Sequence, residues 1–303
     1  WFLQYYKVAC KAQDTKPCAA LEQIINRAKK KNKSIFDLDL FRTGIDTKGL
    51  YAINQAFRDT FKEIKNMSKD LELVNTIDPT SVNLKGNKII SGTAIVDLCL
   101  AIGSLQILDI SENNLGAKGT MELAEALYNY KSLEVLHAAS IGATSPGVIA
   151  LLKALQHSKK LRDLDIGDNG ANEKAAPYIA QLMESCPLQA LSLRDNPITS
   201  SGMKLVVKAI SSCPSLREFD FTNTGMEERV KDLMDVVMNR NDIQKICIGF
   251  NKLGGSSFAT RWAEFVSKQN NLKYVDLRYI NVGSRIRNVR NCLCPLWRYN
   301  LVI

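Results

Sequence analysis

The sequence has little of what most enzymes and membrane proteins need. It contains 2 histidines among 303 residues, too few for a histidine-rich metal site or a convincing catalytic triad. No apolar run approaches the roughly 18 residues that a membrane-spanning helix requires. We therefore expect no catalysis, no metal, no cofactor, no small-molecule substrate and no contact with a membrane.

Disulfide chemistry is not indicated either. The 8 cysteines are scattered along the chain, several at apolar helix or strand positions, and they form no short-chain disulfide framework. This usage is typical of a reducing compartment, so we expect an intracellular protein, cytoplasmic or nuclear. The chain begins at Trp1 without a signal-peptide pattern, and we interpret it as a module of a longer protein.

What the sequence does contain is a repeat. The pattern Leu-x-x-Leu-x-Leu-x-x-Asn-x-Leu-x-x-x-Gly recurs at spacings of 27 to 29 residues. Its clearest copies begin at Leu105, Leu161 and Leu188, and weaker copies begin at Leu133, Leu216, Ile243 and Leu272. Two further copies precede these, around Leu38 and Val82. The pattern predicts nine strands, and a repeat of this length must stack on its neighbours to bury its apolar face.

Each position of the repeat has a physical role. Leu108 and Ile110 are two residues apart, so they point to one side of a strand, while Asp109 points to the other. The asparagine at the ninth position, such as Asn113, is suited to satisfy backbone groups of the adjoining turn. An amphipathic helix comes next, at 121–127 in this copy. Because strand and helix alternate, the strands must be parallel.

This repeat resembles the leucine-rich repeat of the ribonuclease-inhibitor subtype, and the resemblance covers roughly residues 34–283. It implies an α/β leucine-rich-repeat horseshoe solenoid, with nine parallel strands on the concave face and helices on the convex face. Known members include inhibitors, receptor sensor modules, activators of small GTPases, actin regulators and replication-linked histone readers. The resemblance therefore predicts the fold and leaves the function open.

The departures from the repeat suggest three parts. Residues 1–33 lack the pattern and carry two helical patterns separated by Pro17, so we expect a helical N-terminal cap. Residues 34–283 form the repeats, in which the first two strands are 44 residues apart. This spacing indicates an insertion near 58–77 that extends a helix or loop outward. Residues 284–303 lose the pattern and form a C-terminal cap or tail.

The outward strand positions carry the most informative chemistry. Five of the nine central positions are aspartate, and the outward positions together hold eight acidic and four basic residues in a chain of net charge +9. We therefore predict a non-catalytic protein–protein interaction module, with a basic or mixed-charge partner on the concave face. The predicted site consists of Asp39, Asp109, His137, Asp165, Arg194, Asp220, Tyr274, Asp276 and Arg278. The competing interpretation is that these aspartates are repeat consensus and make local hydrogen bonds.

Two further functions stay open. Arg194, near Asn196, resembles the arginine and asparagine of GTPase-activating members, which implies a regulator of a small GTPase, although the repeat itself also explains Asn196. The alternative is a chromatin- or nucleic-acid-associated scaffold. Its edge would consist of the basic residues Lys29, Lys30, Lys31, Arg285, Arg287 and Arg290. The opening segment, with Tyr6, Ala9, Cys10 and Pro17, is weakly similar to that of several eukaryotic proteins, among them the C-terminal repeats of Tonsoku-type scaffolds.

Overall fold

The computed structural model describes residues 1–66, 77–227, 229–252, 256–280 and 300–302. The chain divides into two compact units, residues 1–143 (unit 1) and 144–303 (unit 2). Each unit contains its own set of alternating strands and helices.

Unit 1 contains four parallel strands that pair in chain order, with a helix after each of the first three. Its elements are α1 (Phe2–Ala12), α2 (Ala19–Lys31), β1 (Ile35–Asp39), α3 (Thr47–Asn66), β2 (Ile77–Asn83), α4 (Gly92–Ile102), β3 (Ile107–Asp109), α5 (Gly116–Leu127) and β4 (Val135–His137). In the register of this sheet, Asp39, Asn83, Asp109 and His137 lie side by side.

Unit 2 repeats the same alternation and adds a strand that the pattern does not predict. Its elements are α6 (Thr144–Leu155), β5 (Asp163–Asp165), η1 (Glu173–Ala175), α7 (Ala176–Ser185), β6 (Ala190–Ser192), α8 (Thr199–Ala209), η2 (Ile210–Ser212), β7 (Glu218–Asp220), α9 (Arg229–Val237), β8 (Lys245–Cys247), α10 (Ser256–Ser267), β9 (Tyr274–Asp276) and β10 (Asn300–Val302). The unpredicted strand β10 pairs in parallel with β9. Asp165, Ser192, Asp220, Cys247 and Asp276 are consecutive in the register of β5 to β9.

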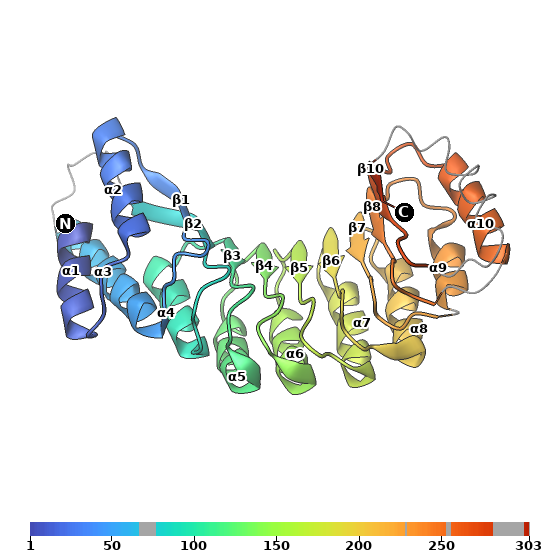
Figure 1. Cartoon of the computed structure of the whole chain (residues 1–303), viewed down its shortest axis with the longest axis horizontal. Helices are drawn as coiled ribbons and strands as arrows, with labels where there is room; N and C mark the ends of the chain where they lie inside the picture. Colours follow the sequence, from blue (N-terminus) through green and yellow to red (C-terminus); the bar gives the residue numbers. More distant parts are fainter. Residues whose placement is uncertain (67–76, 228, 253–255, 281–299, 303) are drawn as a thin grey trace. The chain divides into compact units, whose positions relative to one another are not determined.

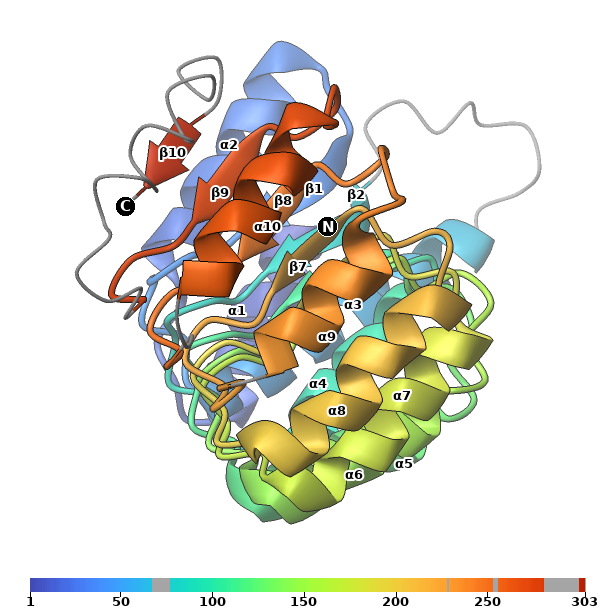
Figure 2. The ribbon, with the colours of Figure 1, turned by 90° about the vertical axis from the view of Figure 1, so that its right-hand side faces the viewer.

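The fold class and the nine strands predicted from the repeat are confirmed. Strands β1 and β3 to β9 begin and end within the predicted copies, whereas β2 begins at Ile77, ahead of the copy around Val82 and at the end of the predicted insertion. All described pairings are parallel. Within unit 2, helices α7, α8 and α9 pack side by side on one side of the strands (Figure 1; Figure 2). Leu164 and Leu191 point to that side and are buried, whereas Asp165 and Ser192 point to the other and are half-buried. These helices therefore leave the other side of the strands uncovered.

A ladder of buried asparagines links several of the repeats to the one before. The Asn196 amide nitrogen donates to the carbonyl oxygens of Leu193 in its own repeat and Ile166 in the preceding one, both at 3.0 Å. Its side-chain oxygen accepts from the backbone nitrogens of Asn169 at 3.1 Å and Ala171 at 2.9 Å. Asn87, Asn113 and Asn251 do the same in their repeats. The role expected of the ninth position is thus confirmed.

The first N-terminal helix, α1, packs against the first repeat helix, α3. The Phe2 ring of α1 lies 4.8 Å from the Phe57 ring of α3, and the Tyr6 hydroxyl of α1 accepts a hydrogen bond from the backbone nitrogen of Cys18 at 2.8 Å. Helix α3 has 20 residues and runs into the predicted insertion. Residues 67–76 of that insertion, and 284–299 of the predicted C-terminal segment, lie outside the described residues.

Candidate functional site: an acidic strand face with an aromatic border

The candidate site is the side of each sheet that the helices leave uncovered, which we call the open face. On this side of unit 1, the central positions are Asp39, Asn83, Asp109 and His137. In unit 2 they are Asp165, Ser192, Asp220, Cys247 and Asp276. Alternation along a strand sends these side chains away from the leucine core.

All five central aspartates make one local hydrogen bond. In each of them one carboxylate oxygen accepts the backbone N–H two residues further on, for example from Gly167 to Asp165 at 2.9 Å and from Thr222 to Asp220 at 3.0 Å. Asn83 occupies the same slot and makes the same bond, to the Lys85 nitrogen at 3.0 Å. The interpretation of these aspartates as repeat consensus therefore accounts for one carboxylate oxygen of each. An asparagine can replace the aspartate in this local role.

The charged partners of these aspartates differ from strand to strand. Asp276 is 4% exposed and is clamped by Arg278, whose Nη2 lies 2.7 Å from Oδ2. Asp109 Oδ2 lies 3.9 Å from His137 Nδ1. Within the described residues, Asp165 and Asp220 form no ion pair. These two carboxylates lie on either side of Ser192, and Asp220 also accepts a side-chain hydrogen bond from Thr222.

Burial and hydrogen bonding shift the pKa values of three of these carboxyls in different directions. Burial raises the pKa of Asp220, and the hydrogen bonds from Thr222 offset this only in part. Burial acts in the same direction on Asp109 and Asp276, but bonds to His137 and Ser111 in the first case, and to Arg278 in the second, bring the net pKa below its usual value. An incoming cation would favour the charged form of Asp220, as the hydrogen bonds from Thr222 already do.

The basic residues of the open face of unit 2 already have partners. Arg194 Nη1 lies 3.2 Å from Asp195 Oδ2, and the Lys245 ammonium lies 5.6 Å above the Tyr274 ring. The outward positions of β5 to β7 and the residue two beyond each strand hold four acidic side chains and one basic one. This part of the open face is therefore acidic, and its one base is neutralised by a neighbour.

Sequence reasoning missed an exposed aromatic pair beside this face. Phe250 and Tyr279 each follow an open-face strand, β8 and β9, by three residues, and their ring centroids are 4.5 Å apart. They are 45% and 79% exposed. The Arg278 guanidinium lies 5.8 Å from the Phe250 ring centroid. The available signal was a bulky aromatic at a turn position that is polar in the preceding repeats of unit 2, as at Asp195 and Asn223.

The residues behind the GTPase hypothesis have structural roles in this unit. Asn196 is 0% exposed and its amide is used by the ladder, so it is not available to a partner. The Arg194 side chain crosses Gly167, where an added Cβ would come within 2.7 Å of Arg194 Cγ. Arg194 is thus held beside Asp195 by the neighbouring repeat.

The predicted basic edge is described only in part. Lys29, Lys30 and Lys31 are exposed in the last turn of α2, where positive charge also complements the helix dipole. Arg285, Arg287 and Arg290 lie outside the described residues.

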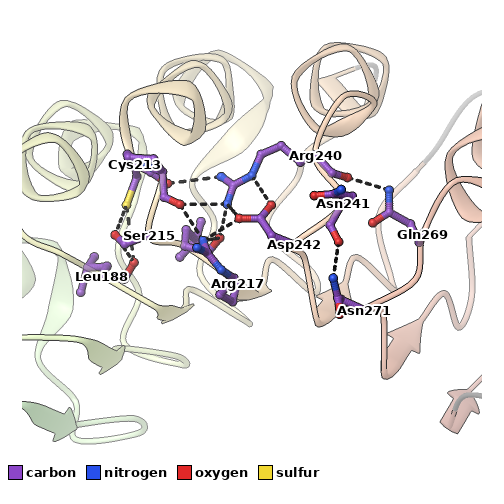
Figure 3. Close-up of polar contacts among 11 residues, drawn as sticks. Leu188, Cys213, Ser215, Arg217, Arg240, Asn241, Asp242, Gln269 and Asn271 are labelled. Atoms are coloured by element: carbon purple, nitrogen blue, oxygen red, sulfur yellow. Dashed lines mark hydrogen bonds and ion pairs between the residues drawn. The ribbon is translucent and has the colours of Figure 1, made fainter.

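The densest polar network of unit 2 lies away from the open face, in the loops that lead into the strands (Figure 3). Arg240 donates to the carbonyl oxygens of Cys213 and Leu216 and forms an ion pair with Asp242 at 2.8 Å, and Arg217 also contacts Asp242 at 2.8 Å. The hydrogen bond from Arg240 is the largest cause that lowers the pKa of Asp242. The network fastens consecutive loops, so we assign it to stability.

Other site types find no support in the described part of the chain. No three His, Cys, Asp or Glu side chains are grouped there so as to hold a metal ion. None of the helices described combines the length and the apolar character needed to cross a membrane.

Known proteins with the same repeat are similar to this chain. A leucine-rich-repeat family model matches residues 104–124 and 184–207. The protein phosphatase 1 regulatory subunit 37 homolog of Caenorhabditis briggsae is 24% identical over 278 residues, covering 82% of this chain and 29% of its own length. Ribonuclease inhibitor of Sus scrofa is 23% identical over 205 residues, covering 67% of this chain and 42% of its own length.

A third relative, NACHT, LRR and PYD domains-containing protein 14 of Mus musculus, is 29% identical over 195 residues, which cover 62% of this chain and 18% of the relative. The chain thus spans less than half the length of each of these relatives. Strand register, buried asparagines and sequence similarity agree. The chain is built of leucine-rich repeats of the ribonuclease-inhibitor type.

Proposed function

We propose that the chain is a non-catalytic protein-binding module whose open strand face takes a basic or mixed-charge protein segment. The contact residues proposed are those predicted from the repeat, namely Asp39, Asp109, His137, Asp165, Arg194, Asp220, Tyr274, Asp276 and Arg278. The names of two relatives denote an inhibitor of a ribonuclease and a regulatory subunit of a phosphatase. A role in binding another protein is consistent with those names.

One observation carries this proposal, the pair of carboxylates on β5 and β7. Asp165 and Asp220 each spend one oxygen on the adjoining turn, and the other has no ion-pair partner among the described residues. They are separated by the strand of Ser192, so they stand roughly 10 Å apart. Each is fixed by a strand, so a cation that binds them loses entropy mainly on its own side.

The test distinguishes the role of each aspartate in holding its turn from the role of its negative charge. The triple variant Asp109→Asn, Asp165→Asn and Asp220→Asn removes three charges and keeps an acceptor for each turn, as Asn83 does naturally. A partner is captured from a cell lysate with the wild-type chain, identified by mass spectrometry, and titrated against both proteins. We expect at least tenfold weaker binding, since each charge-assisted contact contributes about 1.5–3 kcal/mol.

Matched measurements make the outcome decisive. The midpoint of thermal unfolding of the triple variant should stay within a few degrees of wild type, because the turn hydrogen bonds persist. Unchanged affinity for the captured partner would refute the proposal and leave the aspartates as repeat consensus. Loss of function only with Arg194→Ala would favour a GTPase regulator. Loss of nucleic-acid binding after charge reversal at Lys29, Lys30 and Lys31 would favour the scaffold alternative.

A further inference from the structure

The aromatic pair of unit 2 lies on the border of the acidic open face. We propose that Phe250 and Tyr279, with the acidic strands β5 to β7, bind a single extended protein segment. In that segment a basic side chain and an aromatic or large aliphatic side chain are about four or five residues apart. This inference rests on the proposed function and specifies the partner.

The exposure of the two rings first indicates an interface. Tyr279 is 79% exposed and Phe250 is 45% exposed, so neither ring contributes much to the core. Their centroids are 4.5 Å apart with an interplanar angle of 36°, so the two rings form one continuous apolar surface. Covering such a surface with an apolar side chain of a partner removes apolar area from water, which favours association. Tyrosine and arginine are also the residue types enriched where binding energy concentrates.

Arg278 gives this surface a polar anchor. Its Nε and Nη2 are bonded to Asp276, which neutralises the charge and fixes the guanidinium plane. A guanidinium has five N–H donors, and no bond from Arg278 Nη1 to a described residue is present. Arg278 Nη1 can therefore donate to a carbonyl oxygen of a segment whose side chain covers Phe250 and Tyr279.

The charge distribution on the open face of unit 2 determines the rest of the partner. Strands β5 to β7 present Asp165, Glu218 and Asp220, whereas β8 and β9 present Lys245 and the neutralised Arg278. A segment crossing the strands therefore meets an acidic part and then an aromatic part. Complementarity requires its basic residue over β5 to β7 and its apolar residue over the aromatic pair.

Strand spacing converts this arrangement into a sequence separation. From β6, the centre of the acidic part, to the middle of β8 and β9 is two and a half strand spacings, roughly 12 Å. Phe250 lies three residues beyond the end of β8, which adds roughly 10 Å along the strand direction. The diagonal of about 16 Å corresponds to about five residues of extended chain at roughly 3.3 Å each.

The experiment uses random twelve-residue peptides displayed on phage and selected on the whole immobilised chain. We expect enriched peptides to carry Arg or Lys four or five positions from Trp, Tyr, Phe or Leu. The most enriched peptide is then synthesised with a fluorescent label and titrated by polarisation. The Phe250→Ser/Tyr279→Ser variant should bind it at least tenfold more weakly, while Tyr128→Ser, which removes another exposed aromatic of 51% exposure, should bind it as wild type does.

A second variant separates this inference from the proposed function. If Asp165→Asn/Asp220→Asn weakens peptide binding and Phe250→Ser/Tyr279→Ser does not, the aromatic inference is overturned and the acidic face stands. If neither double variant weakens binding, both proposals fail. The inference is also overturned if no peptide is enriched, or if the enriched peptides lack the basic–apolar spacing. It is likewise overturned if sedimentation shows that the chain is a dimer and that the aromatic substitutions make it monomeric. Unchanged thermal unfolding midpoints establish that the variants remain folded.

Discussion

Replacing Asn196 with alanine should lower the stability of unit 2 far more than replacing a solvent-facing residue near it. The Asn196 side chain donates to the carbonyl oxygens of Ile166 and Leu193 and accepts from the backbone nitrogens of Asn169 and Ala171. It is 0% exposed, so water does not take over these bonds without rearrangement. The substitution removes one hydrogen bond from each of these four buried backbone groups, of which the Ile166 carbonyl oxygen keeps the bond from the Asn169 amide nitrogen.

The size of the effect depends on those four groups. A buried donor or acceptor left unsatisfied costs about 1–3 kcal/mol, and relaxation around the smaller side chain recovers part of it. We expect a loss of about 3–6 kcal/mol in the free energy of unfolding, against a total of about 5–15 kcal/mol for a typical domain. Asn196→Asp keeps the acceptor and loses the donors, so it should also destabilise unit 2. Its penalty should shrink at low pH, where the protonated acid can donate one bond.

The assay is urea denaturation followed by far-ultraviolet circular dichroism, with the fluorescence of Trp262, which is buried in unit 2, as a second probe. Ser192→Ala is the control, because it removes a hydroxyl that has no partner within the described structure and should change stability by less than about 0.5 kcal/mol. A loss below about 1 kcal/mol for Asn196→Ala would refute the structural assignment, since each unsatisfied buried group alone should cost at least that much. The asparagine would then be free for the role that the GTPase hypothesis gives it.

Three further predictions concern the same unit. Leu164→Ala should cost about 2–5 kcal/mol in urea denaturation through the cavity it leaves, and equal midpoints for Leu164→Ala and Ser192→Ala would contradict the register. Arg240→Ala removes the bonds to the Cys213 and Leu216 carbonyl oxygens and one of the two arginine partners of Asp242, which keeps Arg217, so we expect a loss of about 1–3 kcal/mol, which a native-like denaturation curve would exclude. Arg278→Ala leaves Asp276 buried and unpaired. Because the bonds from Arg278 hold the pKa of Asp276 below its usual value, the stability lost at pH 7 should shrink as the pH falls through about 4, and a pH-independent loss would argue against the ion pair.

The repeat predicted the strands well because their chemistry is local and periodic. The alternation of Leu108, Asp109 and Ile110 fixes which side of β3 is buried, and the period fixes where the next strand begins. β10 was not predicted because Asn300–Val302 has no such alternation and pairs only through tertiary placement. The helix α3 continues to Asn66, which the spacing of the first two strands indicated only as extra length.

The candidate site was less predictable, since one residue type serves two purposes there. The pattern identified Asp165 and Asp220 as outward, but it could not show that one oxygen of each holds a turn while the other has no ion-pair partner among the described residues. Phe250 and Tyr279 were missed because they occupy a turn position that the consensus leaves unspecified. Their backbone φ angles of 56° and 54° are the same left-handed turn that polar residues adopt elsewhere in the chain.

The asparagine ladder also determines how such a chain can change in length. Asn196 bonds to its own repeat and to the one before it, and Asn251 does the same further along the chain. A deletion or duplication of one whole repeat therefore rejoins equivalent donors and acceptors, whereas any partial deletion leaves an unmatched amide inside the solenoid. Gene rearrangements that add or remove binding strands should survive selection in whole-repeat steps, so related chains are expected to differ in their number of repeats more readily than in repeat length.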